Sequence, residues 1–434
     1  MLNKITLLLC ALLCWQVSAV AAEQISLAQV LAEAEAHAVD LRIADYHLHA
    51  AAAQVAEARS DYYPQLSARL GNEYVRVHGA AGNVVSVGDA ILADNASGYK
   101  HSLTFSAHYT LYDFGRRSLN LQYAEGRRRV AEVEREQTLR RVRQQVIELY
   151  GQGLKQQKKL AVQRLRREAL VQVYRLSERL QKAGRYGREA VVTAALEVAR
   201  AGTELQDMEV EFAAILESLV LYTGQEYEPT TTLFAELEAL TGIDSSGYIL
   251  ERHPDLLRIE KEIDQKRIEL TLARRSRYPQ VVLSGSHRLF GSDQRRFDDS
   301  FSSLTSRDSR IVVMIDIPLF AGFRSVAQTE RLRFELGALE WQQQKIGAEL
   351  SLEIRQRQRL YQSLAAQANA RSEQQYLVER QRHDLERMTQ QQLLDQVVAR
   401  RRQVEASLYE LDIEIRRIDL AVQSLLLHNL MEGS

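Results

Sequence analysis

The stretch YYPQLSARLGNEY, residues 62–74, decides how this chain folds, and RYPQVVLSGSHRL, residues 277–289, repeats it. In both stretches a polar, helix-like segment ends at Tyr-Pro-Gln, and an alternation of apolar and polar residues begins. Proline ends a helix because it has no amide hydrogen, and it biases the preceding residue towards extended geometry. Alternation with a period of two predicts a β-strand with two different faces. The chain is therefore expected to pass from helix to strand twice.

The predicted strands come in pairs, one pair in each half of the chain. Their expected ranges are about 63–77, 102–113, 279–290 and 310–319. The clearest is LTFSAHYTLY, in which apolar residues alternate with threonine, serine and histidine. Polar loops are expected within the pairs, at about 79–100 and 291–309.

Long helices without proline occupy most of the remaining chain. Their expected ranges are 26–59, 116–182, 188–222, 248–276, 323–388 and 393–430. Apolar residues in the return helices recur at steps of three and four, which is the pattern of a coiled-coil seam. At ~1.5 Å per residue, the helix 116–182 would be ~100 Å long, about twice its return helix 188–222.

Corresponding features of the two halves lie roughly 203–215 residues apart, which indicates an internal duplication. The chain is expected to comprise a signal peptide (1–22), a first repeat (23–225), an equatorial non-helical segment (226–247) and a second repeat (248–434). The last helix and the first helix of the mature chain would then lie end to end and together match the long helix of the second repeat.

The N-terminal sequence MLNKITLLLCALLCWQVSAVAAEQ is typical of a secretory signal peptide cut before Glu23. Its apolar run is shorter than the ~18 residues that a membrane-spanning helix needs. Cys10 and Cys14 both lie in it, so the mature chain is expected to have no disulfide and no thiol chemistry. Neither cysteine follows the small residues of a lipoprotein signal. The near balance of 56 basic and 57 acidic residues gives no indication of nucleic-acid binding.

The number of strands limits how they can be used. Each is near the ~9–11 residues that a tilted strand needs to cross a bilayer. A sheet in lipid must close, because lipid cannot satisfy an open edge, and the smallest bacterial barrels have ~8 strands. Four strands must then be pooled between chains, and three chains with twelve strands and an open lumen are favoured over two. A soluble sheet capping a helical bundle, as in a periplasmic coiled-coil adaptor or scaffold, remains the alternative of another class.

The strand-to-helix joints LYDFGRRS (111–118) and IPLFAGFRS (317–325) complete the pattern. With the paired Tyr-Pro-Gln stretches, the signal peptide and the two-fold repeat, they resemble the TolC family of outer-membrane efflux and secretion channel proteins over 23–434. The resemblance implies an all-α coiled-coil tunnel plus a transmembrane β-barrel. In that fold, an internally duplicated protomer with four strands is pooled in a homotrimer to a twelve-stranded barrel.

The resemblance also implies a function. The chain is expected to form the outer-membrane exit duct of a tripartite export system in a Gram-negative bacterium, with a periplasmic tunnel and no enzymatic activity. The implied partners are a periplasmic adaptor (membrane fusion) protein, an inner-membrane ABC or RND transporter, and outer-membrane lipid, with no nucleic acid and no cofactor. Because a lipoprotein cysteine is missing, type I protein secretion is favoured, and multidrug efflux through the same architecture is the alternative.

Seven residues are expected to mark where strands and helices join at the membrane interface: Tyr63, Pro64, Gly115, Tyr278, Pro279, Pro318 and Gly322. Tyrosine suits this place because its amphipathic ring collects at the lipid–water boundary. The histidines form no metal-ligand pattern, and no metal site is expected.

A gate residue can be carried over from the family at one position. The stretch LLDQVVA, 393–399, corresponds to the entrance just after the last helical turn, and Asp395 matches an acidic position there. A second acidic position of the family corresponds to Val398 in this chain. A ring of three Asp395 carboxylates would favour cations at a narrow opening. The alternative is a solvated carboxylate that only stabilises the first turn of a helix.

Overall fold

A computed structural model describes residues 23–76, 85–87, 90–92, 98–230, 232–240, 250–293, 296–390 and 396–431. The chain forms two compact units, one from 1–47, 132–258 and 344–434 and the other from 48–131 and 259–343. Each unit therefore takes residues from both sequence repeats, because the longest helices run from one unit into the other. We call them the helical unit and the sheet unit. The predicted signal peptide and the gate candidate Asp395 lie outside the described residues.

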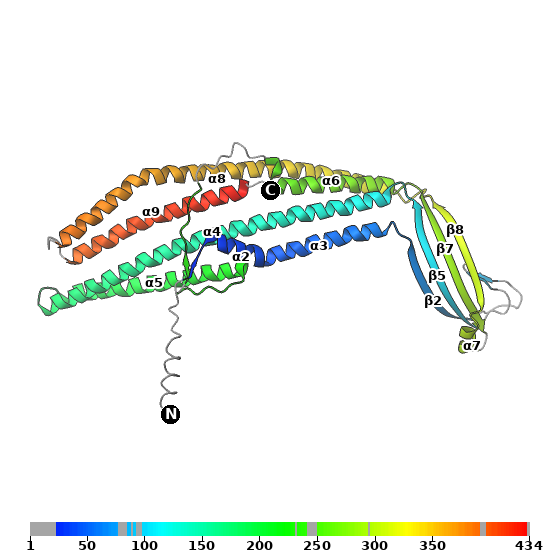
Figure 1. Ribbon diagram of the computed structural model, residues 1–434, viewed down its shortest axis with the longest axis horizontal. Helices are drawn as coiled ribbons and strands as arrows, with labels where there is room; N and C mark the ends of the chain where they lie inside the picture. Colours follow the sequence, from blue (N-terminus) through cyan, green and yellow to red (C-terminus); the bar gives the residue numbers. More distant parts are fainter. Residues whose placement is uncertain are drawn as a thin grey trace, which may run out of the picture. The chain divides into compact units, whose positions relative to one another are not determined.

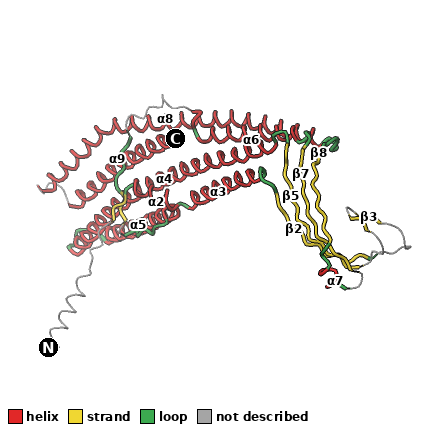
Figure 2. The backbone as a smooth tube through the Cα atoms, turned by 45° about the vertical axis from the view of Figure 1, so that its right-hand side comes forward, coloured by secondary structure: helices red, strands yellow, loops and turns green. Residues whose placement is uncertain are grey.

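The sheet unit holds a four-stranded antiparallel sheet in the order β2-β5-β7-β8 (Figures 1 and 2). The strands are β2 (Gln65–Val75), β5 (Gly98–Tyr112), β7 (Gln280–Asp293) and β8 (Ser306–Asp316). The two repeats join where β5 pairs with β7. Among the described residues, β2 and β8 each have a neighbour on one side only, and a separate short hairpin is formed by β3 (Val85–Val87) and β4 (Ala90–Leu92).

The prediction of a polar loop over residues 291–309 is wrong, because the irregular segment between β7 and β8 is shorter and contains a helix. β7 continues to Asp293, a short helix α7 (Phe297–Ser302) follows, and β8 begins at Ser306. Polar residues remain in the ladder here because backbone pairing continues to the Phe290–Ser306 pair. Gly291 lets α7 pack on the sheet, since an added Cβ would lie 2.6 Å from the Ser300 carbonyl oxygen. Likewise β5 begins at Gly98, inside the loop predicted at 79–100.

The helices are α2 (Leu27–His37), α3 (Val39–Ser60), α4 (Arg116–Lys182), α5 (Arg188–Thr223), α6 (Pro254–Arg275), α8 (Arg324–Gln390) and α9 (Gln396–Met431). The helix predicted at 26–59 is interrupted at Ala38, whose ψ of 124° is not helical. Ser26 and Gln29 form a capping box at the start of α2. α6 begins at Pro254 rather than 248, after a 3-10 turn η1 (Leu250–Arg252). In the described part of the chain, no helix has the length and apolar character needed to cross a membrane.

The helical unit has its own core, built on one short parallel strand pair. β1 (Glu23–Ile25) pairs with β6 (Thr232–Phe234), which lies in the predicted non-helical segment. Tyr150 of α4 is fully buried, and its hydroxyl lies 2.9 Å from the Ile25 carbonyl oxygen and 2.8 Å from that of Ala235. Burial raises the pKa of Tyr150 to about 12. One side chain thus ties α4 to β1 and to the residue that follows β6.

A buried histidine begins α6 in the same unit. The Asp255 amide donates to His253 Nδ1 over 3.2 Å, so the imidazole caps the helix. Burial lowers the pKa of His253 and outweighs the nearby carboxylate of Asp255, while the charge of Arg140 lowers it further. Glu353 and Glu136 raise it by smaller amounts. The cap therefore works with a neutral ring near neutral pH.

Candidate functional site at the strand–helix junctions

The sheet has two chemically different faces. Cross-strand pairing sets one mainly apolar group of residues side by side: Leu66, Ala68, Leu70, Leu103, Phe105, Ala107, Leu283, Leu289, Ile311, Val313 and Ile315, with His287, Arg307 and Ser309 among them. On the edge strands β2 and β8 these side chains are open to the surroundings, since Leu66 is 78% and Ile311 82% exposed. The other face carries Gln65, Ser67, Arg69, Ser102, Thr104, Ser106, Ser284, Ser286, Arg288, Asp308 and Arg310, with Val282, Phe290, Val312 and Met314 among them. An exposed apolar face backed by a largely polar face is the pattern of a membrane strand.

Aromatic clusters stand at both ends of the sheet. At the α7 end, Phe297 contacts Tyr99 and His101 with ring centroids 5.8 and 4.5 Å apart. At the helix end, Phe114 contacts Tyr112 and Tyr278 at 4.8 and 5.4 Å. Tyr99 and Tyr112 lie at opposite ends of β5, which rises roughly 45 Å between them at ~3.4 Å per residue. Tilted by ~40°, that span becomes ~35 Å, about the separation of the two interfaces of a bilayer.

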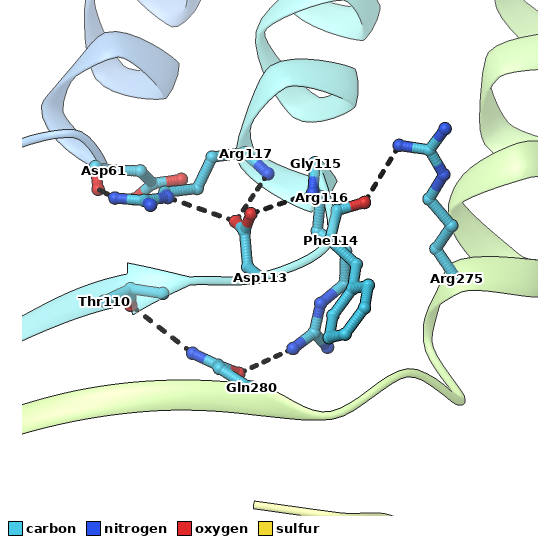
Figure 3. A network of polar contacts seen from close by, with 9 residues as sticks. All are labelled: Asp61, Thr110, Asp113, Phe114, Gly115, Arg116, Arg117, Arg275 and Gln280. Carbon is cyan, nitrogen blue, oxygen red and sulfur yellow. Dashed lines mark hydrogen bonds and ion pairs between the residues drawn. The ribbon is translucent and has the colours of Figure 1, made fainter. Parts of the chain in front are cut away.

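The first strand-to-helix junction is organised by Asp113 (Figure 3). Its Oδ1 accepts a hydrogen bond from the Gly115 amide at 3.0 Å, and its Oδ2 accepts from the Arg117 amide at 2.8 Å. Oδ2 also accepts from Arg117 Nε at 3.1 Å. A carboxylate at the start of α4 satisfies amides that have no helical partner and interacts favourably with the helix dipole.

Three further side chains link this junction to the neighbouring elements β7 and α6 (Figure 3). Arg116 Nη2 donates to Gln280 Oε1 over 2.8 Å, and Gln280 Nε2 donates to the Thr110 hydroxyl over 3.4 Å. Arg275, at the end of α6, donates to the Phe114 carbonyl oxygen over 2.9 Å. Gln280 is the last residue of the second Tyr-Pro-Gln stretch, so this stretch is held against the joint that ends the other strand pair.

Both strand-to-helix joints use two successive residues with left-handed backbone. Phe114 and Gly115 have φ of 54° and 77°, and Gly322 and Phe323 have φ of 61° and 63°. A left-handed conformation costs an L-residue about 1–2 kcal/mol, whereas glycine adopts it freely. The order of phenylalanine and glycine is reversed between the repeats, but the backbone path is the same.

The structure places the seven predicted junction residues between strands and helices. Tyr63 and Pro64 lie between α3 and β2, Tyr278 and Pro279 between α6 and β7, Gly115 between β5 and α4, and Pro318 and Gly322 between β8 and α8. Their position at a membrane surface stays a prediction. Sequence reasoning missed Asp113, Arg117 and Gln280, although an aspartate just before a helix start is a recognisable capping signal.

A polar cavity of about 340 Å³ lies beside the first junction. Asp61, His108, Asn120, Arg116 and Gln280 are among its lining residues. In the described part of the chain, no group of three or more histidine, cysteine, aspartate or glutamate side chains is placed to hold a metal ion. The side chains of the junction are engaged in tying strands to helices.

Residues 30–225 match the family described as outer membrane efflux protein. The outer membrane protein VceC of Vibrio cholerae is 18% identical, with a TM-score of 0.70 over 94% of this chain and 96% of that one. The Campylobacter jejuni CmeC outer membrane channel is 15% identical, with a TM-score of 0.73 over 94% and 85%. The open state of the Neisseria gonorrhoeae MtrE outer membrane channel is 16% identical, with a TM-score of 0.64 over 94% and 89%. No curated protein matches.

The resemblance to the TolC family is confirmed. The fold of these outer membrane channels covers 94% of this chain, so the predicted fold class is confirmed as well. The family description also agrees with the predicted outer-membrane location and with a transport rather than an enzymatic role. The closure of three copies into one twelve-stranded barrel belongs to the proposal below.

Proposed function

We propose that this chain forms the outer-membrane exit duct of a tripartite export system. The observation that carries the proposal is the two-faced sheet. Its apolar face is exposed over the length of a bilayer, and aromatic clusters lie at both ends. An apolar face of this kind suits lipid, and the polar face suits a water-filled lumen.

The open edges of the sheet support assembly from several copies. β2 and β8 each leave a row of backbone groups without a strand partner among the described residues, and lipid offers no substitute. Pairing β8 of one copy with β2 of the next satisfies both edges. Three copies give twelve strands and a lumen wide enough for transport, so we propose a homotrimer.

The helical unit supports the proposed partners. α4 and α5 form a hairpin through the turn 183–187, where Gly184 has φ of 71° and Tyr186 is 42% exposed. Exposed apolar side chains continue along α5 at Val192 and Leu196. Such a surface suits coiled-coil pairing with a periplasmic adaptor, which would link the duct to an inner-membrane ABC or RND transporter.

Two cargo classes fit this duct. Type I protein secretion is the sequence-based proposal, and small-molecule efflux is favoured by the description of the matching family. A deletion strain separates them. Loss of one secreted polypeptide with unchanged drug and metal susceptibility supports secretion, and the reverse result supports efflux.

The duct itself is tested by fractionation. The full chain should co-sediment with outer membranes and migrate at three times its monomer mass until it is boiled. A soluble periplasmic product would contradict the proposal and favour the adaptor or scaffold reading.

Asp395 remains the proposed gate residue. In planar bilayers, Asp395→Asn should weaken the block of single-channel conductance by multivalent cations, because three carboxylates at a narrow opening attract them. Unchanged block would refute the proposed ring.

A further inference from the structure

The polar face of the sheet gathers three arginines on two adjacent rungs. In the cross-strand register, Arg69 of β2 lies opposite Thr104 of β5, which lies opposite Arg288 of β7, which lies opposite Asp308 of β8. The next rung towards the helices pairs Ser286 with Arg310. Three arginines and one aspartate are therefore gathered within two rungs.

The rest of this face contrasts with these two rungs. Beyond these two rungs, Ser102, Thr110 and Ser284 carry hydroxyls. Near the α7 end, Glu73 lies directly opposite Lys100, so these two charges are balanced. Asp316 lies at the helix end of β8, opposite Gln280.

The arginines are close enough to act together. Neighbouring strands are ~4.8 Å apart, so Arg69 and Arg288, two strands apart, start ~10 Å from each other. Arg310 is the diagonal neighbour of Arg288, at ~7–8 Å. Arg288 Nη2 is 3.8 Å from Asp308 Oδ2, so the one aspartate faces Arg288. Arg69 and Arg310 are both exposed. The two rungs keep a net positive charge.

We infer that Arg69, Arg288 and Arg310 form a cationic belt inside the duct that selects for anionic solutes, such as organic carboxylates and phosphates. The inference rests on the proposed function, because closure of the sheet turns this face into the lumen wall. Three copies would set nine arginines against three aspartates within this two-rung band of the lumen wall. Rings of arginine favour anions in pores because they offset the loss of the anion's hydration.

The belt predicts the ion selectivity of the full chain in planar bilayers under a KCl gradient. The wild type should favour chloride over potassium when the barrel limits the current. In water, a unit charge at ~8 Å changes the local concentration of a monovalent ion about two-fold. Arg69→Ser or Arg310→Ser should therefore lower the chloride-to-potassium permeability ratio by about two-fold each, and Asp308→Ser should raise it.

A matched control lies next to the belt. Arg307 is an exposed arginine of β8, the strand that carries Arg310. It lies on the opposite face of the sheet, in register with Leu289. Arg307→Ser should leave the permeability ratio unchanged, because this side chain faces away from the lumen. Arg69 and Arg310 stand on the edge strands β2 and β8, so their variants should disturb the fold less than Arg288→Ser and keep the test available if that variant does not assemble.

The outcomes separate the belt from the duct. Conductance with an unchanged ratio in both Arg69→Ser and Arg310→Ser would overturn the belt and leave the duct standing. An equal shift in Arg307→Ser would also overturn it. A wild type that does not co-sediment with outer membranes would contradict the proposed function and the belt together.

Discussion

The two strand-to-helix junctions share a backbone path but differ in how they are held. The first is tied within the chain by Asp113, Arg117 and Arg275. The second has exposed apolar residues, with Leu319 92% and Phe323 73% exposed. The duplication therefore preserved the backbone geometry of the junction, but contacts within a single chain hold only the first of the two junctions in place. Because the second junction follows the open edge strand β8, a neighbouring copy or lipid would cover it in the proposed assembly.

The largest effect should come from Asp113. Asp113→Ala removes a buried carboxylate that accepts from two amides and Arg117, and we expect a loss of about 3 kcal/mol in the free energy of unfolding. Urea denaturation of the detergent-solubilised protein measures it. The matching position of the second junction is Ala321, and Ala321→Asp should add a cap worth about 1 kcal/mol. A loss below 0.5 kcal/mol in Asp113→Ala, on the order of an exposed ion pair, would remove the distinction between the junctions.

Glycine substitutions should give the next largest difference. Gly115→Ala places a Cβ 2.6 Å from Arg275 Nη1 in a left-handed residue, whereas at Gly322 no atom lies within 4 Å of the added Cβ. We expect Gly115→Ala to cost about 2–3 kcal/mol and Gly322→Ala about 1 kcal/mol, the backbone term alone. The same urea titration ranks them. Equal costs would show that the contact with Arg275 has no energetic weight.

Acidification should lower the stability of the helical unit through His253. It should leave the difference in stability between the two junctions unchanged. Above about pH 6.5, His253 is neutral in the folded and unfolded states. Below it, the unfolded chain binds a proton that the folded chain resists, because burial lowers the pKa of His253. The free energy of unfolding should therefore fall as the pH falls from 6.5 towards the lowered pKa.

His253→Asn provides the control for this pH dependence. Asparagine can cap α6 but cannot gain a proton, so its stability should vary less between pH 7 and pH 5.5. Asp113→Ala should keep the full wild-type slope, since it lies in the other unit. If the stability of His253→Asn depended on pH as strongly as that of the wild type, His253 would not be the source of the pH dependence.

The smallest effect should come from the strained phenylalanines. Phe323→Gly relieves a left-handed residue but loses one ring contact, with Phe320 at 5.4 Å, so it should stabilise the solubilised chain by less than about 1 kcal/mol. Phe114→Gly gives the same relief but loses ring contacts with Tyr112 and Tyr278, so the two terms should nearly cancel. A loss of stability in Phe323→Gly would show that the second junction is held inside the chain after all.

The sequence was informative wherever one local pattern dominated. Proline and alternation located the four strands, and the uninterrupted helical pattern located α4 to its two ends, Arg116 and Lys182. The strand ends near 98 and 306 were missed because backbone pairing there is independent of side-chain polarity. The Asp113 network and the arginine belt bring together residues that are far apart in the chain. They depend on how the strands pair, and a short stretch of sequence does not specify that pairing.

The most direct test of the central claim is a cysteine scan along β8 in intact outer membranes. The predicted mature chain has no cysteine, so each introduced thiol reports alone. A water-soluble thiol reagent should label Arg310→Cys, Val312→Cys and Met314→Cys from the lumen. Ile311→Cys, Val313→Cys and Ile315→Cys should stay protected by lipid, giving a period of two. Uniform labelling of all six positions would contradict a membrane-inserted, two-faced sheet.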